Sequence, residues 1–153
     1  MTLQRAVLMV VLSSCAPIAE EVSRAEAQLR AATVVEGPTL GMFGQTSSQA
    51  LALQKILASA EHAERFERLI ASGSLPAIIY GLCGLALTDR AAFLIAVEPF
   101  RAPKKGVALF TADIMIQHYE VAEMLEPTSV QAKPGSLPFE QFTLFCTSLR
   151  TVK

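Results

Sequence analysis

Tryptophan is absent from this chain of 153 residues, and only two histidines and three cysteines are present. The sequence contains no Cys-x-x-Cys, His-Glu-x-x-His or Asp-x-Asp-x-Asp spacing, the patterns typical of zinc and calcium sites. It also contains no Gly-x-Ser-x-Gly or Ser-x-x-Lys motif of a nucleophilic enzyme. We therefore expect no metal, no cofactor and no enzymatic activity.

An excess of charge of either sign is also missing. Thirteen basic residues stand against 14 acidic ones, which gives a formal net charge of −1. A near-neutral chain lacks the basic surface that binds nucleic acid, so we expect no nucleic-acid partner. Hydrophobic residues, in contrast, make up 52% of the chain, and the mean hydropathy is +0.40. This composition favours an apolar surface that meets another chain, a ligand or a membrane.

The amino terminus carries the most specific pattern. Arg5 is followed by an apolar run over 6–12, and the sequence Leu12-Ser-Ser-Cys15 ends it. A positive residue, a short apolar stretch and small residues before a cleavage point are typical of a secretory signal. Seven apolar residues span only about 10 Å as a helix, too little to cross a bilayer. The segment resembles the signal and lipobox of bacterial lipoproteins.

That resemblance implies a signal peptide over 1–14, a lipid-modified Cys15 as the first mature residue, and a single helical domain over 15–153. It also implies a location in the cell envelope, anchored by lipid. Ala16 follows the cysteine, as in lipoproteins sorted to the periplasmic face of the outer membrane of Gram-negative cells. The stretch Leu75–Phe93 is similar to helical segments of uncharacterised bacterial lipoproteins, and it carries no catalytic motif.

Helical periodicity and capping residues dominate the middle of the chain. They predict an amphipathic helix over 18–32 and four antiparallel helices in a helical core over 46–98. The third of the four is apolar almost all round, so we expect it to be central. Gly81 and Gly84 on one of its faces predict the close approach of a neighbouring helix. Two stacked αα-hairpins of this kind are similar to the repeats of HEAT-like solenoids, and the predicted class is mainly α with a minor β part (α+β).

Charges on the second of these helices recur four residues apart. They form two pairs, Glu61 with Arg65 and Glu64 with Arg68. Such pairs stabilise an exposed helix by about 0.2–0.5 kcal/mol each, so we interpret this side as a solvated face. His62, in the same polar first turn, is expected to face solvent.

The segment over 99–153 is mixed in character. A proline-stiffened loop carries the candidate partner-binding residues Arg101, Lys104 and Lys105, because loops on a rigid scaffold often carry recognition. Short apolar runs at 107–110 and 114–116 predict strands, as a β hairpin or an extended segment.

A short helix over 118–125 and a linker over 128–138 are expected next. The tail over 139–149 has apolar residues at both helical and strand spacing. We favour a strand or a docked amphipathic segment there.

Cys83 and Cys146 leave two alternatives open. In an oxidising compartment the pair could form a disulfide. Cys83 lies among leucines and glycines, however, where a free thiol behaves as a small buried hydrophobic group, and we favour two buried thiols.

The preferred hypothesis for function is a membrane-anchored envelope lipoprotein that acts as a protein-binding or scaffold module. Its partner is an unknown envelope protein. An alternative is an immunity-type protein that neutralises a toxin. A third is a small hydrolase-like enzyme that uses His118 with Asp113 or Tyr119.

Overall fold

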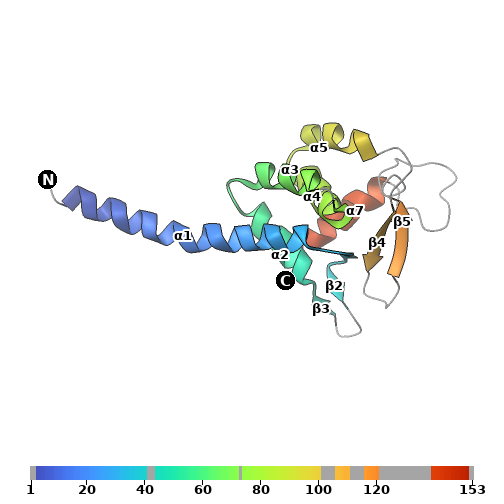
Figure 1. The fold of residues 1–153 in the computed structure, drawn as a ribbon, viewed down its shortest axis with the longest axis horizontal. Coiled ribbons are helices and arrows are strands. Elements are labelled where there is room, and N and C mark those ends of the chain that lie inside the picture. The colour runs from blue at the N-terminus through green and yellow to red at the C-terminus, as the bar shows by residue number, and fades with distance from the viewer. Residues whose placement is uncertain are drawn as a thin grey trace.

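A central apolar helix, α4 (Leu75–Thr88), organises the fold, and every residue from Pro76 to Leu85 is buried. The computed structural model describes the backbone of residues 3–40, 44–72, 74–100, 106–110, 116–120 and 139–151. Figure 1 shows the other helices and strands, most of which pack against α4. They are α1 (Leu3–Arg30), β1 (Val35–Glu36), β2 (Thr39–Leu40), β3 (Gln45–Thr46), α2 (Ser48–Leu57), α3 (His62–Ala71), α5 (Arg90–Val97), the 3-10 helix η1 (Glu98–Phe100), β4 (Gly106–Phe110), β5 (Ile116–Glu120) and α7 (Phe139–Arg150).

Two glycines of α4 allow α3 to pack closely against it. A Cβ atom at Gly81 would lie 2.6 Å from Cγ1 of Ile70 and 2.8 Å from the carbonyl oxygen of Phe66. A Cβ atom at Gly84 would overlap the ring of Phe66. Only a residue without a side chain leaves room for this contact, so the predicted close approach is confirmed.

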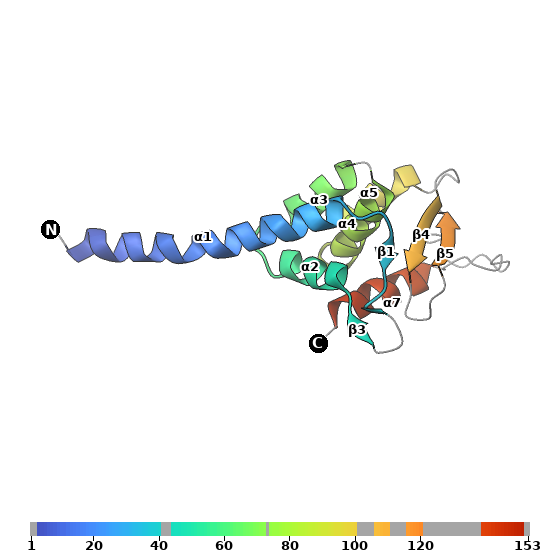
Figure 2. The ribbon, with the colours of Figure 1, turned by 60° about the horizontal axis from the view of Figure 1, so that its bottom comes forward.

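α1 and α2 pack along each other beside this pair. Val22, Ala25 and Leu29 of α1 are buried, as the periodicity predicts, whereas Ile18 is 64% exposed. Ser47 is the N-cap of α2, and its hydroxyl accepts a hydrogen bond from the backbone N–H of Ala50. Figure 2 shows that the first half of α1 extends away from the rest of the molecule.

A small mixed sheet lies at the end of the molecule opposite the start of α1 (Figure 2). Its order is β1-β4-β5, with β1 parallel to β4, and Gly106 opposite Glu120 in the antiparallel β4–β5 pair. The predicted hairpin is therefore present, but β5 runs over 116–120. The backbone of His118 is extended, so the expected helix does not begin there. β2 and β3 form a separate antiparallel pair.

The tail forms a helix docked on the core, so the docked amphipathic segment is confirmed and the alternative of a strand is wrong. Phe142, Cys146 and Leu149 of α7 are fully buried at helical spacing. This face brings Cys146 onto α4, with a Cα–Cα distance of 5.1 Å to Cys83, and the two cysteines form a disulfide. The interpretation as two free thiols is therefore corrected. Cys146 lies on the buried helical face of the tail together with Phe142 and Leu149, and this position directs it toward Cys83.

The mainly helical class with a minor β part is confirmed. Asp89 caps α5 by accepting hydrogen bonds from the N–H groups of Ala91 and Ala92. Phe93 of α5 stacks on Phe142 of α7, with ring centroids 6.1 Å apart. α4 itself contacts α1 and α3 from the first half of the chain and α5 and α7 from the second half.

Candidate functional site

Cys15, the predicted lipidation site, lies within α1, in the half that extends away from the domain (Figure 1). From Pro17 to Glu21 every side chain is exposed, and Val22 is the first buried residue among the described side chains. No helix in the described part of the chain is both long enough and apolar enough to cross a membrane. The site is therefore a cysteine in the backbone of α1 that precedes an exposed stretch over 17–21, about two turns before the first described buried residue, Val22.

A cluster of arginines around Glu26 binds the carboxyl-terminal half of α1 to the domain. Glu26 is only 7% exposed. Arg68 binds both carboxylate oxygens at 3.0 Å, Arg65 donates to Oε2 at 2.8 Å, and Arg30 donates to Oε1 at 2.9 Å. Arg65 also reaches Glu61 at 2.9 Å. The cluster joins α1 to α3, so the helix that carries Cys15 is held firmly on the domain.

This cluster corrects the interpretation of α3 as having a solvated charged face. Arg65 is 7% exposed, although its predicted pairing with Glu61 is present. The physical reason is Glu26, which lies on the buried stripe of α1 between Ala25 and Leu29 and needs cationic partners. Its position in that stripe was the available sequence signal.

The pKa of Glu26 is held below its ordinary value. The hydrogen bond from Arg68 is the largest cause, and it outweighs the opposing effect of burial. A second link is exposed, between Lys55 of α2 and Glu21 of α1 at 2.6 Å, and it also lowers the pKa of that carboxylate. Both carboxylates are thus ionised wherever the protein is near neutral pH.

A buried polar network fixes the start of the sheet to the helices. The hydroxyl of Tyr80 donates to the side-chain oxygen of Gln49 and accepts from the backbone N–H of Glu36 at 2.8 Å. The hydroxyl of Ser47 donates to the Glu36 carboxylate at 2.7 Å. Burial raises the pKa of Tyr80 far above its ordinary value, so this phenol stays neutral. Every group is satisfied by a neighbour in the fold, which is typical of a structural network.

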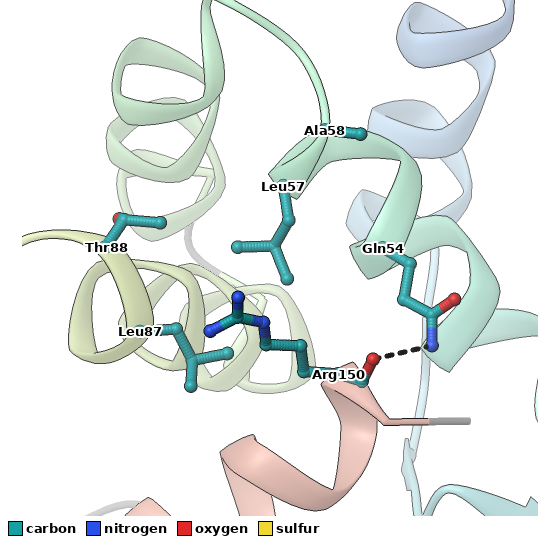
Figure 3. Close-up of a pocket in the computed structure, with 6 residues that line it drawn as sticks. All are labelled: Gln54, Leu57, Ala58, Leu87, Thr88 and Arg150. Atoms are coloured by element: carbon teal, nitrogen blue, oxygen red, sulfur yellow. Dashed lines mark hydrogen bonds between the residues drawn. The ribbon is translucent and has the colours of Figure 1, made fainter. Parts of the chain in front are cut away.

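A pocket of about 360 Å³ opens where α2, α4 and α7 end (Figure 3). Leu57, Leu87 and Ala58 supply apolar walls, and Thr88 and Arg150 supply polar ones. The amide of Gln54 is already used, since it donates to the backbone carbonyls of Leu149 and Arg150.

Three helix carboxyl ends concentrate partial negative charge at this pocket, which favours a cation. The guanidinium of Arg150 reaches between Leu57 and Leu87 in Figure 3 and supplies that cation from the chain itself. Among the described residues that line it, none carries a carboxylate, imidazole or thiol. These residues therefore supply no acid, base or strong nucleophile for catalysis.

The other predicted residues are only partly described. Arg101, Lys104, Lys105 and Asp113 lie outside the described residues. His118 is in β5, which is not the strand-to-helix junction that the sequence predicted.

His62 begins α3, and its Nδ1 lies 2.8 Å from the carbonyl oxygen of Ser59. Across the described ranges, no three His, Cys, Asp or Glu side chains gather as potential metal ligands.

No protein-family model matches this chain, and no curated protein or solved structure is significantly similar to it.

Proposed function

We propose that this chain is an exported lipoprotein of the bacterial envelope, anchored through Cys15 and binding another protein through the segment after Pro99. The observation that carries the anchoring part is the position of Cys15 in α1. It lies ahead of Val22, the first buried residue among the described side chains, and two residues before a proline that suits a helix start.

Pro17 supports cleavage before Cys15. It lies inside the 28-residue helix of the full chain, where a proline lacks the N–H for its hydrogen bond and costs about 3 kcal/mol. In a chain that begins at Cys15, the same residue falls in the first turn. The N–H groups of a first turn have no helical partner, so a proline there is well tolerated. Removal of residues 1–14 therefore turns an unfavourable proline into a favourable one.

Among the described side chains the core begins at Val22, well after this cleavage point. The seven residue-to-residue steps from Cys15 to Val22 correspond to about 10 Å of helix. The domain then stands close to the lipid surface, with Glu26 and Lys55 holding α1 in place.

The disulfide supports export independently of the amino terminus. Cys83 and Cys146 join two helices of the core. Disulfides persist in the periplasm and outside cells and are rare in the reducing cytosol. Two separate features of the chain, at residues 12–15 and in the core, thus favour the same kind of compartment.

The arrangement in space supports a partner site after Pro99. Both views place β4 and β5 at the end of the molecule opposite the start of α1 (Figures 1 and 2). Among the described strands β5 lies at an edge of the three-stranded sheet, and in the sequence Arg101, Lys104 and Lys105 come shortly before β4. We infer that the partner supplies an extended acidic segment, which pairs with this edge through main-chain hydrogen bonds.

Capture from the envelope tests this proposal. The protein is purified with its cross-linked partners, and a variant with Arg101, Lys104 and Lys105 all changed to Glu should lose them. A control, Arg24→Glu, reverses an exposed cation of α1 whose surface pair with Glu20 contributes little, and it should keep them. Capture that survives the triple reversal, or that is lost equally in the control, would contradict the assignment of the partner site.

A further inference from the structure

The outer face of α5 is apolar along its length. Leu94 is 42% exposed and Ile95 is 76% exposed, and Ala91 is exposed one turn before them. The opposite face, with Phe93 and Val97, is buried against the core. Residues three and four apart share one side of a helix, so the three exposed residues form a continuous stripe. Contiguous apolar surface of this kind marks an interaction site.

A charged residue lies at each end of this stripe, and each has the same sign as the partial charge of the helix end where it lies. Arg90 is the first residue of α5 and Glu98 follows its last residue, and both are exposed. The amino end of a helix carries partial positive charge and the carboxyl end partial negative charge. Each charged residue is therefore repelled by the end at which it lies.

We propose that the α5 face binds a second copy of this chain, with the two α5 helices antiparallel about a two-fold axis. In this arrangement Arg90 of each copy lies opposite Glu98 of the other, and each helix end gains a charge of the favourable sign. Leu94 is midway between these two residues, so it meets its own copy at the axis. A two-fold interface is self-complementary in this way.

The contact is small, because two eight-residue helices bury less than the roughly 1,200–2,000 Å² of a stable soluble complex. The dimer is therefore weak in dilute solution and gains strength wherever the chain is concentrated. The inference does not rest on the lipid anchor. A two-fold axis normal to a membrane would nevertheless bring both Cys15 residues to the same height, so anchoring and pairing are compatible.

Disulfide trapping tests the geometry. The full chain carries Cys15→Ser, which leaves Cys83 and Cys146 as its only cysteines, both buried in their disulfide. Leu94→Cys in this background should cross-link into dimers at least tenfold faster than Ala91→Cys. Both positions are exposed on the same stripe, but antiparallel symmetry holds two copies of residue 91 apart.

Charge exchange tests the register. Arg90→Glu should slow trapping at Leu94→Cys severalfold, and Arg90→Glu with Glu98→Arg should restore it. Restored trapping in the double variant is the decisive result. Glu98 also interacts within its own chain, so a substitution of Glu98 alone would not isolate the contact between the two copies. Circular-dichroism melting verifies that each variant is folded.

Several outcomes would overturn the proposal. One is trapping at Ala91→Cys as fast as at Leu94→Cys, and another is no trapping at Leu94→Cys at high concentration. A third is Ile95→Glu abolishing co-sedimentation with phosphatidylglycerol vesicles while Leu94→Cys remains monomeric, which would make a lipid surface the occupant of the stripe.

Discussion

Gly84 is the residue at which the packing of α3 on α4 is most sensitive. The ring of Phe66 occupies the space that a Cβ atom would need. Gly84→Ala should therefore lower the free energy of unfolding by about 1–3 kcal/mol, despite the better helix propensity of alanine. Thermal melting of the variant measures this change.

A second substitution tests the cause. In a Phe66→Leu background the aromatic ring is gone, so the cost of Gly84→Ala should become smaller, as expected for residues in direct contact. Equal costs in both backgrounds would mean that Phe66 is not what restricts position 84.

Glu26 is the residue that neutralises the arginine cluster between α1 and α3. Glu26→Gln leaves the buried guanidinium of Arg65 with only Glu61, and it should cost about 3 kcal/mol at pH 7. Glu20→Gln is the matched control, since the Glu20–Arg24 pair is exposed on both sides. Its cost should stay below about 1 kcal/mol.

The same cluster makes stability depend on pH. The pKa of Glu26 is lower in the folded chain than in the unfolded chain, because Arg68 stabilises the carboxylate. Its contribution is therefore complete above the ordinary glutamate pKa and is lost as the pH falls through the folded value. Between about pH 6 and pH 3, urea unfolding should show a steeper loss of stability in the wild type than in Glu26→Gln. Parallel curves for the two proteins would contradict this assignment.

Among the elements, α7 depends most on a covalent link. The disulfide joins residues 63 apart in sequence. In the chain-entropy model, closing a loop of that size lowers the entropy of the unfolded chain and stabilises the folded state by about 4 kcal/mol. Cys83→Ala with Cys146→Ala should lower the stability by about that amount, as measured by urea unfolding. A loss no greater than that caused by the Glu20→Gln control would mean that the disulfide does not fasten α7.

The elements also differ in how far the sequence predicts them. α4 and α5 are well predicted because Ser74 and Asp89 are strong N-caps and because the apolar pattern of each helix is unambiguous. For the tail the sequence left a strand and a docked amphipathic segment open, because its apolar residues satisfy two periods at once, and the structure shows the second as a helix. Only the tertiary contact with α4, through Cys83, decides between a helix and a strand.

At the candidate site the same distinction holds. The four residues that end in Cys15 are a local pattern and could be found in the sequence. The arginine cluster depends on helices that are far apart in the chain, with Glu26 in α1 and Arg65 in α3. No spacing rule within one helix predicts such a pairing, because it is set by how α1 lies against α3.

At the scale of the whole molecule, the helix that carries Cys15 and the β4–β5 hairpin are separated in space. α1 extends from one end, and the β4–β5 hairpin lies at the other (Figure 2). If Cys15 is the anchor, the hairpin lies away from the point of attachment. A partner could then reach the hairpin without displacing α1.

The intact mass of the protein extracted from bacterial membranes tests the central claim, lipid anchoring at Cys15, most directly. We predict a chain that begins at Cys15, carries added acyl chains and fractionates with membranes, because two or more chains anchor a protein stably. Cys15→Ser should be found without acyl chains and outside the membrane fraction. If the wild type and Cys15→Ser are both soluble at the unprocessed chain mass of 16.4 kDa, the account is contradicted.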